Sequence, residues 1–278
     1  MHLSQKEKGE RFLALHAGPG AFVIPNPWDA GTARILASRG FKALTTTSAG
    51  LAFTLGRRDG SGNVTRDEVL ANAKAIVDAC DIPVAADLEN GYDDKPEGVV
   101  ETIRLAGEVA GLVGGSIEDA TGNPQRPIYD FNYAVERVAA AAEAARGLAY
   151  PFVLVGRAEN FLHNRSDLDD TIRRLQAFEA AGAGALYAPG ITRAEDIRTV
   201  CASVGKPVNV IAGLNNTPFS VSQLAAMGVR RISVGSALSR AALGAFIRAS
   251  EEIKEQGTFT FADGIISYRE LNDLMSGS

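Results

Sequence analysis

Short apolar segments recur along the chain, and most are rich in β-branched residues. They show little alternation of polar and apolar positions, as is typical of parallel strands covered on both faces. The expected strands begin near Ala21, Ala43, Pro83, Gly114, Phe152, Ala185, Pro207 and Arg230. Apolar positions at helical spacing fill the intervals between these segments, so the pattern predicts eight successive strand–helix units.

Several helix starts can be read from local signals. A Thr or Ser followed three residues later by Glu forms a capping box, Pro is favoured in a first helical turn, and Asp caps a helix through its carboxylate. The expected starts are a box at Thr65 and Glu68, a first turn at Pro96, a cap at Asp130 and a second box at Thr192 and Glu195.

Eight strand–helix units with right-handed crossovers close naturally into an α/β fold of the (β/α)8 or TIM-barrel type. An open doubly wound sheet is the competitor, but no G-x-G-x-x-G follows the first strand. An extra helix is expected over residues 5–16, a long Ala-rich helix over Ala237–Gln256, and a helical tail from Thr258 onward. No linker-like segment divides the chain, so residues 1–278 are expected to form a single domain.

Composition excludes several classes of protein. The chain is 46% hydrophobic, and its 28 Lys+Arg against 33 Asp+Glu give a formal charge of −5, which argues against disorder and against a nucleic-acid or membrane partner. It has no apolar run of membrane-spanning length, and its N-terminus is polar. Only two cysteines occur, which favours a reducing compartment, and a cytoplasmic location is expected.

Chemistry in such a barrel lies at the carboxyl ends of the strands. Asp87 and Glu89 end the third strand and are expected to face the same side, while Glu118 ends the fourth and Asp59 follows the second. Carboxylates at this density repel one another, and a hard cation such as Mg²⁺ or Mn²⁺ relieves the repulsion. The alternative is that each acid only caps the next helix.

Arg157 is the cation at the end of the fifth strand. Beside a metal it would bind a substrate carboxylate or a developing oxyanion; the alternative is an internal salt bridge to Glu118 or Glu159. His163, in the following loop, is either a general acid or a surface residue. No lysine is expected inside the barrel, and both cysteines, Cys80 and Cys201, fall at its opposite end, which argues against Schiff-base and thiol catalysis.

The segments NPWDAGTARILASRGFKAL, TTSAGLAFTLGRRDG, AADLENGY, GGSIEDA and LVGRAE occur in this order, and together they resemble the isocitrate lyase/phosphoenolpyruvate mutase superfamily. The resemblance runs from about Phe22 to beyond Asn209. It implies a (β/α)8 barrel, a homo-oligomer (dimer or tetramer) that swaps its last barrel helix between partners, bound Mg²⁺, and a small 2-oxo acid or enolpyruvate-type substrate.

Carried over by position, the resemblance also implies roles for individual residues. Asp87 is similar to the acid nearest the metal, and Glu89, Glu118 and Asp59 are similar to acids that hold it largely through water. Arg157 resembles the family's substrate arginine. The implied substrate contacts are Arg157, the turn Thr47-Ser48-Ala49 and Asn209, and the implied catalytic residues are Arg157, Asp59 and Glu118.

The loop from Ala120 to Tyr129 departs from the family pattern. It reads ATGNPQRPIY, without the cysteine of the K-x-C-G-H-type segment of isocitrate and methylisocitrate lyases, and without the gate lysine of the phosphonate enzymes; only Asn123 is similar to that gate. We therefore expect a Mg²⁺-dependent lyase that breaks a C–C bond of an oxaloacetate-like 2-oxo acid through an enolate stabilised by the metal and Arg157, with this loop as a lid.

Four alternatives remain open at this point. One is phosphonopyruvate hydrolase or phosphoenolpyruvate mutase chemistry on a P–C bond, and another is a 2-methylisocitrate-type lyase. A third is a barrel that binds a sugar phosphate at Gly213 and Gly235, and the fourth is a non-catalytic barrel that binds an oxo acid.

Overall fold

The computed structural model describes residues 3–60, 62–214 and 218–276. Its strands are β1 (Phe22–Ile24), β2 (Leu44–Thr45), β3 (Val84–Asp87), β4 (Gly114–Glu118), β5 (Val153–Arg157), β6 (Ala185–Tyr187), β7 (Val208–Ile211) and β8 (Arg231–Ser233). All paired strands are parallel, in the order β1-β8-β7-β6-β5-β4-β3-β2. The amide of Thr45 donates to the carbonyl of Pro25 (3.1 Å), so the first and second strands also meet and the sheet is a nearly closed barrel.

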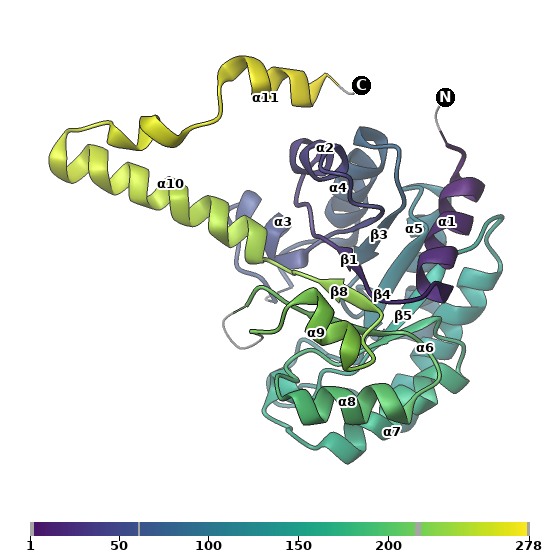
Figure 1. Ribbon diagram of the computed structural model, residues 1–278. Helices are drawn as coiled ribbons and strands as arrows, with labels where there is room; N and C mark the ends of the chain where they lie inside the picture. The colour runs from purple at the N-terminus through teal and green to yellow at the C-terminus, as the bar shows by residue number, and fades with distance from the viewer. Residues whose placement is uncertain (1–2, 61, 215–217, 277–278) are drawn as a thin grey trace.

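Helices surround this barrel and confirm the predicted (β/α)8 fold (Figure 1). The α-helices are α1 (Gln5–Ala17), α2 (Ala30–Ser38), α3 (Ser48–Thr54), α4 (Arg66–Ala79), α5 (Pro96–Glu108), α6 (Phe131–Arg146), α7 (Leu168–Ala180), α8 (Ala194–Ser203), α9 (Val221–Ala226), α10 (Ala237–Gln256) and α11 (Tyr268–Met275). Two 3₁₀ turns are η1 (Asn160–His163) and η2 (Thr260–Gly264). Among the described residues, no helix is long and apolar enough to cross a bilayer.

Helix α1 closes one end of the barrel. Its Phe12 is fully buried among interior side chains of the strands, including Ile24, Ala85 and Val155. A Cβ on Gly114 of β4 would lie 2.6 Å from the Phe12 ring, so this strand position has room only for glycine. The barrel interior is therefore filled from below by α1, and its free end is the mouth at the carboxyl ends of the strands.

One predicted capping box is wrong, and one predicted cap makes no hydrogen bond although its helix begins where expected. Helix α8 begins after Arg193 and has no side-chain cap; Glu195 pairs instead with Arg193 (2.9 Å), so Thr192 and Glu195 form no capping box. Asp130 precedes α6, but its exposed carboxylate makes no cap hydrogen bond and faces Arg126 (3.4 Å). In both cases the acid lies beside an exposed arginine that is close in the chain.

Other local predictions are confirmed. Thr65 and Glu68 form a capping box at α4, and Pro96 occupies the first turn of α5. The N-terminal helix and the helix Ala237–Gln256 form where the pattern placed them. The tail contains η2 and α11, and it returns to α2, where Arg34 Nη1 donates to the carbonyl of Met275 (2.6 Å).

Candidate active site

Three charged side chains meet where β3, β4 and β5 end. Glu118 and Arg157 are paired residues of neighbouring strands. Arg157 Nη1 lies 3.1 Å from Glu118 Oε2 and 3.3 Å from Asp87 Oδ1. All three side chains are at least four-fifths buried, so the ion pairs are poorly screened by solvent.

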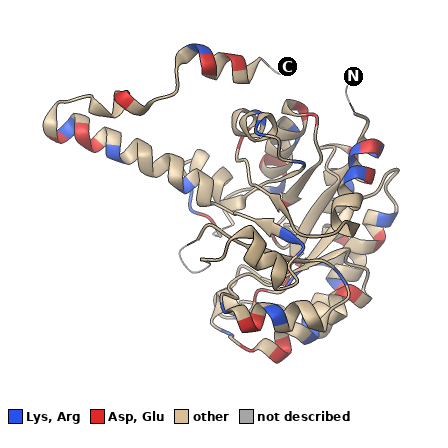
Figure 2. Cartoon of the chain, viewed as in Figure 1, with Lys and Arg blue, Asp and Glu red and all other residues tan. Residues whose placement is uncertain are grey.

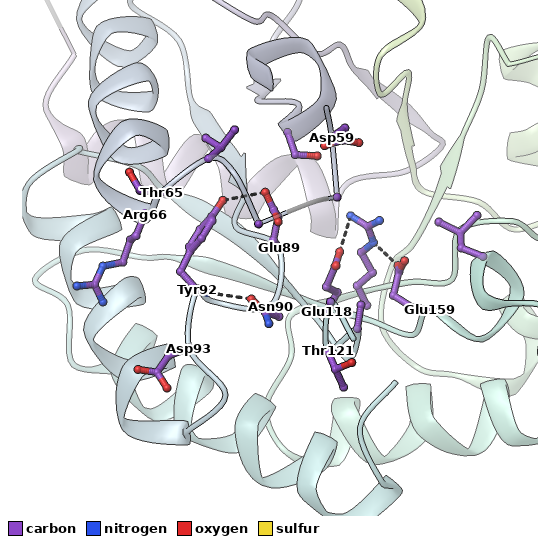
Figure 3. Close-up of a pocket in the computed structure, with 18 of the residues that line it drawn as sticks. Asp59, Thr65, Arg66, Glu89, Asn90, Tyr92, Asp93, Glu118, Thr121 and Glu159 are labelled. Atoms are coloured by element: carbon purple, nitrogen blue, oxygen red, sulfur yellow. Dashed lines mark hydrogen bonds and ion pairs between the residues drawn. The ribbon is translucent and has the colours of Figure 1, made fainter. Parts of the chain in front are cut away.

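A third carboxylate completes the surroundings of this guanidinium. Arg157 Nε donates to Glu159, a residue that is 2% exposed, and Figure 3 shows Glu118 and Glu159 joined by dashed lines to the same guanidinium. The salt bridges that the sequence offered as an alternative are therefore present, together with one to Asp87. These three ion pairs hold the Arg157 guanidinium in a fixed position at the mouth.

Glu89 reaches the mouth by a different route from the one predicted. The strand β3 ends at Asp87, and Glu89 has a left-handed backbone (φ 46°), so the two acids do not share a strand face. The hydroxyl of Tyr92, which also has a positive φ (59°), donates to Glu89 Oε1 (3.4 Å). With Gly91 (φ 85°), three left-handed residues within four positions make a tight turn that aims Glu89 at the pocket (Figure 3).

Asp59 approaches from the loop after α3. Its carboxylate accepts hydrogen bonds from the Ser48 side chain and the Gly60 amide, yet burial, and then the charge of Asp87, raise its pKa. Burial followed by the charges of Asp87 and Asp59 raises the pKa of Glu89 to about 7. Burial is likewise the largest cause of the raised pKa of Glu118. Burial is thus the first cause of all three shifts, and repulsion between the neighbouring carboxylates adds to it. Five carboxylates around one guanidinium leave a formal surplus of negative charge.

This donor set fits a hard divalent cation. Carboxylate oxygens are the ligands that Mg²⁺ prefers, and a +2 ion would offset the surplus charge. In the part of the chain that the structure describes, no three Asp, Glu, His or Cys side chains stand close enough together to hold an ion directly. The fit is therefore through bridging water, which Mg²⁺ gives up reluctantly.

Two connected cavities lie at this end of the barrel. The outer one, about 730 Å³, is lined by Glu89, Glu118 and Glu159, and the inner one, about 260 Å³, reaches Asp87 and the barrel interior. Ser48, Asp59, Leu162 and Arg157 line both. A small molecule in the inner cavity would thus lie directly beneath the charged cluster.

The predicted substrate contacts line the inner cavity. The turn Thr47-Ser48-Ala49 opens α3, and Thr47 Oγ1 accepts from the amide of Gly50 (3.3 Å). Asn209 on β7 also lines it, and its Nδ2 donates to Ser233 Oγ (3.0 Å). The structure therefore brings these residues to one cavity with Asp87 and Arg157, separated from Glu89.

The glycines considered for phosphate binding are less suited to it. The amides of Val234 and Gly235 both donate to Asn26 Oδ1 (2.9 Å each), so neither is free for a phosphate oxygen. Gly213 has a left-handed backbone (φ 78°) and does not line the inner cavity. The sugar-phosphate alternative therefore loses the Gly235 amide as a phosphate donor.

The loop from Ala120 to Tyr129 lies beside the outer cavity and has internal structure. Ala120 and Ile128 form an antiparallel bridge, and the amide of Thr121 donates to the carbonyl of Pro127 (2.9 Å). Ala120 and Thr121 line the outer cavity, as does His163 from η1. A lid role for the loop remains a prediction, and His163 stays a candidate general acid by position only.

Sequence reasoning missed several residues that support the site. Arg137 of α6 is 1% exposed and donates to the carbonyls of Asn90, Asp93 and Asp94, which fixes the turn that carries Glu89 and Tyr92. The signal was available, because Arg137 lies three residues after Ala134 and four before Ala141 on an apolar helix face. A charge in that position predicts a buried, paired side chain.

A second supporting pair joins the ends of β4 and β5. Asp119 Oδ2 pairs with Arg174 Nη1 (3.0 Å), and Asp119 Oδ1 accepts from the amide of Glu159 (2.8 Å). Arg174 Nη1 also donates to the carbonyl of Tyr129 (3.0 Å). This buried network fixes Glu159 and the base of the loop together, and only tertiary proximity reveals it.

Comparisons with known proteins agree with this architecture. The chain is 56% identical to a Burkholderia cenocepacia J2315 protein provisionally described as a lyase/mutase, with a TM-score of 0.95 over 98% of this chain and 96% of that one. It is 27% identical to a 2,3-dimethylmalate lyase of the PEP mutase/isocitrate lyase superfamily, with a TM-score of 0.87 over 97% and 94%. It is also 28% identical to an oxaloacetate decarboxylase of Bradyrhizobium diazoefficiens, covering 81% of this chain and 77% of that protein.

The model of the phosphoenolpyruvate phosphomutase family matches residues 12–254, which include every strand of the barrel and all the acids of the mouth. The protein is therefore an enzyme of the phosphoenolpyruvate phosphomutase family, within the PEP mutase/isocitrate lyase superfamily.

Proposed function

We propose that this enzyme is a lyase that breaks a C–C bond of a small, oxaloacetate-like 2-oxo acid. The observation that carries the proposal is the position of Arg157, a buried guanidinium at the junction of the inner cavity and the acidic mouth. The similarity to an oxaloacetate decarboxylase and to a 2,3-dimethylmalate lyase supports the same reaction class.

In this proposal each side chain has a distinct part. The substrate carboxylate binds at Thr47-Ser48-Ala49, and Asn209 contacts the rest of the acid from the opposite wall. As the bond between C3 and the departing carbon breaks, its electron pair forms the C2=C3 double bond, and the 2-oxo oxygen becomes an enolate. Arg157, always protonated, donates to that oxygen and stabilises its charge. The departing carbon leaves as CO₂ in a decarboxylation, or as a carbonyl compound that has lost its hydroxyl proton in a retro-aldol cleavage, and a proton from water added at C3 completes the reaction.

The surrounding acids keep the cation and the turn in place. Glu118 orients the guanidinium through its 3.1 Å contact, and Asp59 fixes the turn through its hydrogen bond with Ser48. Asp87, Glu89 and Glu118 would hold Mg²⁺ or Mn²⁺, largely through water. When bound, the ion supplies Lewis-acid polarisation of the 2-oxo group and compensates the carboxylates.

A metal-dependent activity screen tests the proposal. Purified protein with and without Mg²⁺ is offered 2-oxo acids, 2-hydroxy tricarboxylates and phosphonopyruvate, and C–C cleavage of an oxo acid is the expected activity. Arg157→Met should lower kcat by ~10²–10³-fold through loss of charge stabilisation. Asp87→Asn should abolish the Mg²⁺-dependent turnover. Arg173→Met and Asp78→Asn serve as matched controls, because each makes the same substitution in an ion pair at the surface. Full activity in Arg157→Met or Asp87→Asn would refute the assignment.

P–C bond chemistry is the second candidate, because the matching family model is that of a phosphomutase. Release of phosphate or formation of phosphoenolpyruvate from phosphonopyruvate, with no oxo-acid cleavage, would establish it. A 2-methylisocitrate-type reaction is less compatible with the cysteine-free loop from Ala120 to Tyr129. A non-catalytic barrel would bind oxo acids in calorimetry without converting any of them.

We also propose that the enzyme is a homo-oligomer that exchanges α10. This helix leads away from its own barrel (Figure 1), and of its twenty residues only Ser239 is buried. Its charges gather toward the far end (Figure 2), whereas Phe246 and Ile247 are 70% and 54% exposed. Exposed apolar residues of this kind on α10, the last helix of the barrel, indicate a binding partner. A second copy of the chain offers the barrel surface that α10 leaves uncovered.

A further inference from the structure

The inner cavity ends on a second buried arginine. Arg231 begins β8, is 5% exposed, and lines the same cavity as Arg157. Strand pairing connects the two: Arg157 pairs with Tyr187, Tyr187 with Asn209, and Asn209 with Arg231. Residues in one such row face the same side of the sheet, so both arginines project into the barrel, one at the mouth and one deeper among β6, β7 and β8.

Unlike the other buried arginines, Arg231 has no ion-pair or hydrogen-bond partner among the described residues. Arg157 pairs with three carboxylates, Arg174 with Asp119 and Asp170, and Arg137 with three carbonyls. Arg231 makes no ion pair or hydrogen bond with any residue that the structure describes, and its Nε and Nη1 are buried without an acceptor.

The described side chains around Arg231 offer its charge the face of one aromatic ring and no anion. Its guanidinium carbon lies 5.8 Å from the centre of the Phe12 ring, and neutral His16 lies on the same side. Burial lowers the pKa of Arg231 to about 10, with only Tyr187 acting in the other direction. Asn209 adds a buried Oδ1 without a donor. Burying a guanidinium without an anion costs free energy of folding, so an arginine in such a position is expected where the site binds an anion.

We propose that Arg231 forms an anion subsite at the floor of the inner cavity, and that this subsite binds the second carboxylate of the substrate. This inference rests on the proposed function and narrows its substrate to dicarboxylic acids. The first carboxylate and the reacting oxygen lie at the mouth with Thr47-Ser48-Ala49 and Arg157, and the far carboxylate pairs with Arg231. A monocarboxylic acid of the same length leaves Arg231 unpaired.

A matched pair of ligands isolates the second carboxylate. Malate and 2-hydroxybutyrate have the same four-carbon chain and the same 2-hydroxy acid group, and only malate carries a second carboxylate. Calorimetric titrations with Mg²⁺ present compare the two in wild type, Arg231→Met and Arg231→Lys. Arg230→Met is the control, because Arg230 is the adjacent, exposed residue and its side chain donates to the carbonyls of Gly18 and Gly20, away from the cavity lining.

Wild type and Arg230→Met should bind malate ~10- to 100-fold more tightly than 2-hydroxybutyrate, the range expected for one charge-assisted pair. Arg231→Met should bind both equally, and Arg231→Lys should retain part of the preference. Arg231→Met should also raise the Tm, because it removes an unpaired buried charge. A merely structural arginine would lower the Tm on replacement.

Three results would overturn the inference: no preference for malate in wild type, the same preference in Arg231→Met, or binding of inorganic phosphate that depends on Arg231 without any preference for malate. If Arg231→Met is unfolded by circular dichroism, Arg231→Lys decides the test. If Arg231→Met loses the preference for malate and the wild-type enzyme cleaves no oxo acid, the subsite is supported and the lyase proposal is refuted. If the wild-type enzyme cleaves an oxo acid and Arg231→Met keeps the same preference for malate, the lyase proposal is supported and the subsite is refuted.

Discussion

The stability of the barrel should depend on the ionisation of His16. This side chain of α1 is 6% exposed and packs edge-on against Phe12 and Phe22, with ring centroids 4.6 and 5.0 Å away. Its Nδ1 hydrogen-bonds to the carbonyl of Phe12 (2.8 Å), while Nε2 is buried without a partner. Burial, and then the positive charge of Arg231, lower its pKa from 6.5 to about 4. His16 is therefore neutral in the folded protein at pH 5, whereas the unfolded chain is protonated there.

The direction and size of the effect follow from this difference. Between pH 6.5 and about 4 the unfolded state binds the additional proton, so the free energy of unfolding falls as the pH falls through this window. From pH 8 to pH 5 the loss due to His16 amounts to about 2 kcal/mol, because each unit of pKa difference is worth about 1.4 kcal/mol and the titration is incomplete at pH 5.

Urea unfolding of wild type and His16→Leu at pH 8, 6.5 and 5 measures this contribution. The two proteins share all other titrating groups, so the difference between their free energies of unfolding isolates His16. That difference should shift by about 2 kcal/mol in favour of His16→Leu on going from pH 8 to pH 5. A difference that stays constant over this range would refute the reasoning, whatever its absolute value.

Three further outcomes are expected. Asp119→Ala removes one of the two carboxylates of the buried Arg174 and the acceptor of the Glu159 amide, and it should cost about 3 kcal/mol in the free energy of unfolding, measured by urea denaturation. Thr65→Ala removes the capping box of α4 and should cost about 1 kcal/mol, whereas Asp130→Ala, which removes no cap hydrogen bond, should lie within about 0.5 kcal/mol of wild type in the same assay. Phe246→Glu places a charge among the exposed apolar residues of α10 and should give a smaller species in light scattering; an unchanged mass would exclude that face from the assembly.

Much of the architecture could be predicted because it is encoded locally. The apolar strand segments and the capping box at Thr65 specify elements within a few residues, and eight repeats of one unit leave few ways to close a sheet. The box that failed at Thr192 and the cap hydrogen bond that Asp130 does not make both involve acids that lie beside an arginine close by in the chain. Glu68 also pairs with Arg57 (2.8 Å) and still completes its capping box, so a nearby charge does not by itself defeat a local signal.

The site was less predictable, since its residues come from different strands. The pattern indicated acids at the strand ends, and the fold does bring Asp87 and Glu118 to Arg157. The approach of Glu89 depends on a left-handed turn held by Arg137, some fifty residues away in the chain. Such long-range contacts have no periodic signature in one sequence.

Short segments of the chain specify a barrel of eight strand–helix units and the acidic character of its mouth, because hydrophobic period and residue type are local properties. Which charges are satisfied depends on contacts between distant parts of the chain. The tertiary structure surrounds Arg157 with three carboxylates and leaves Arg231, in the same row of paired strands, without one. The difference between these two arginines arises from burial and from the partners that folding brings near. No local pattern in the sequence indicates either of them.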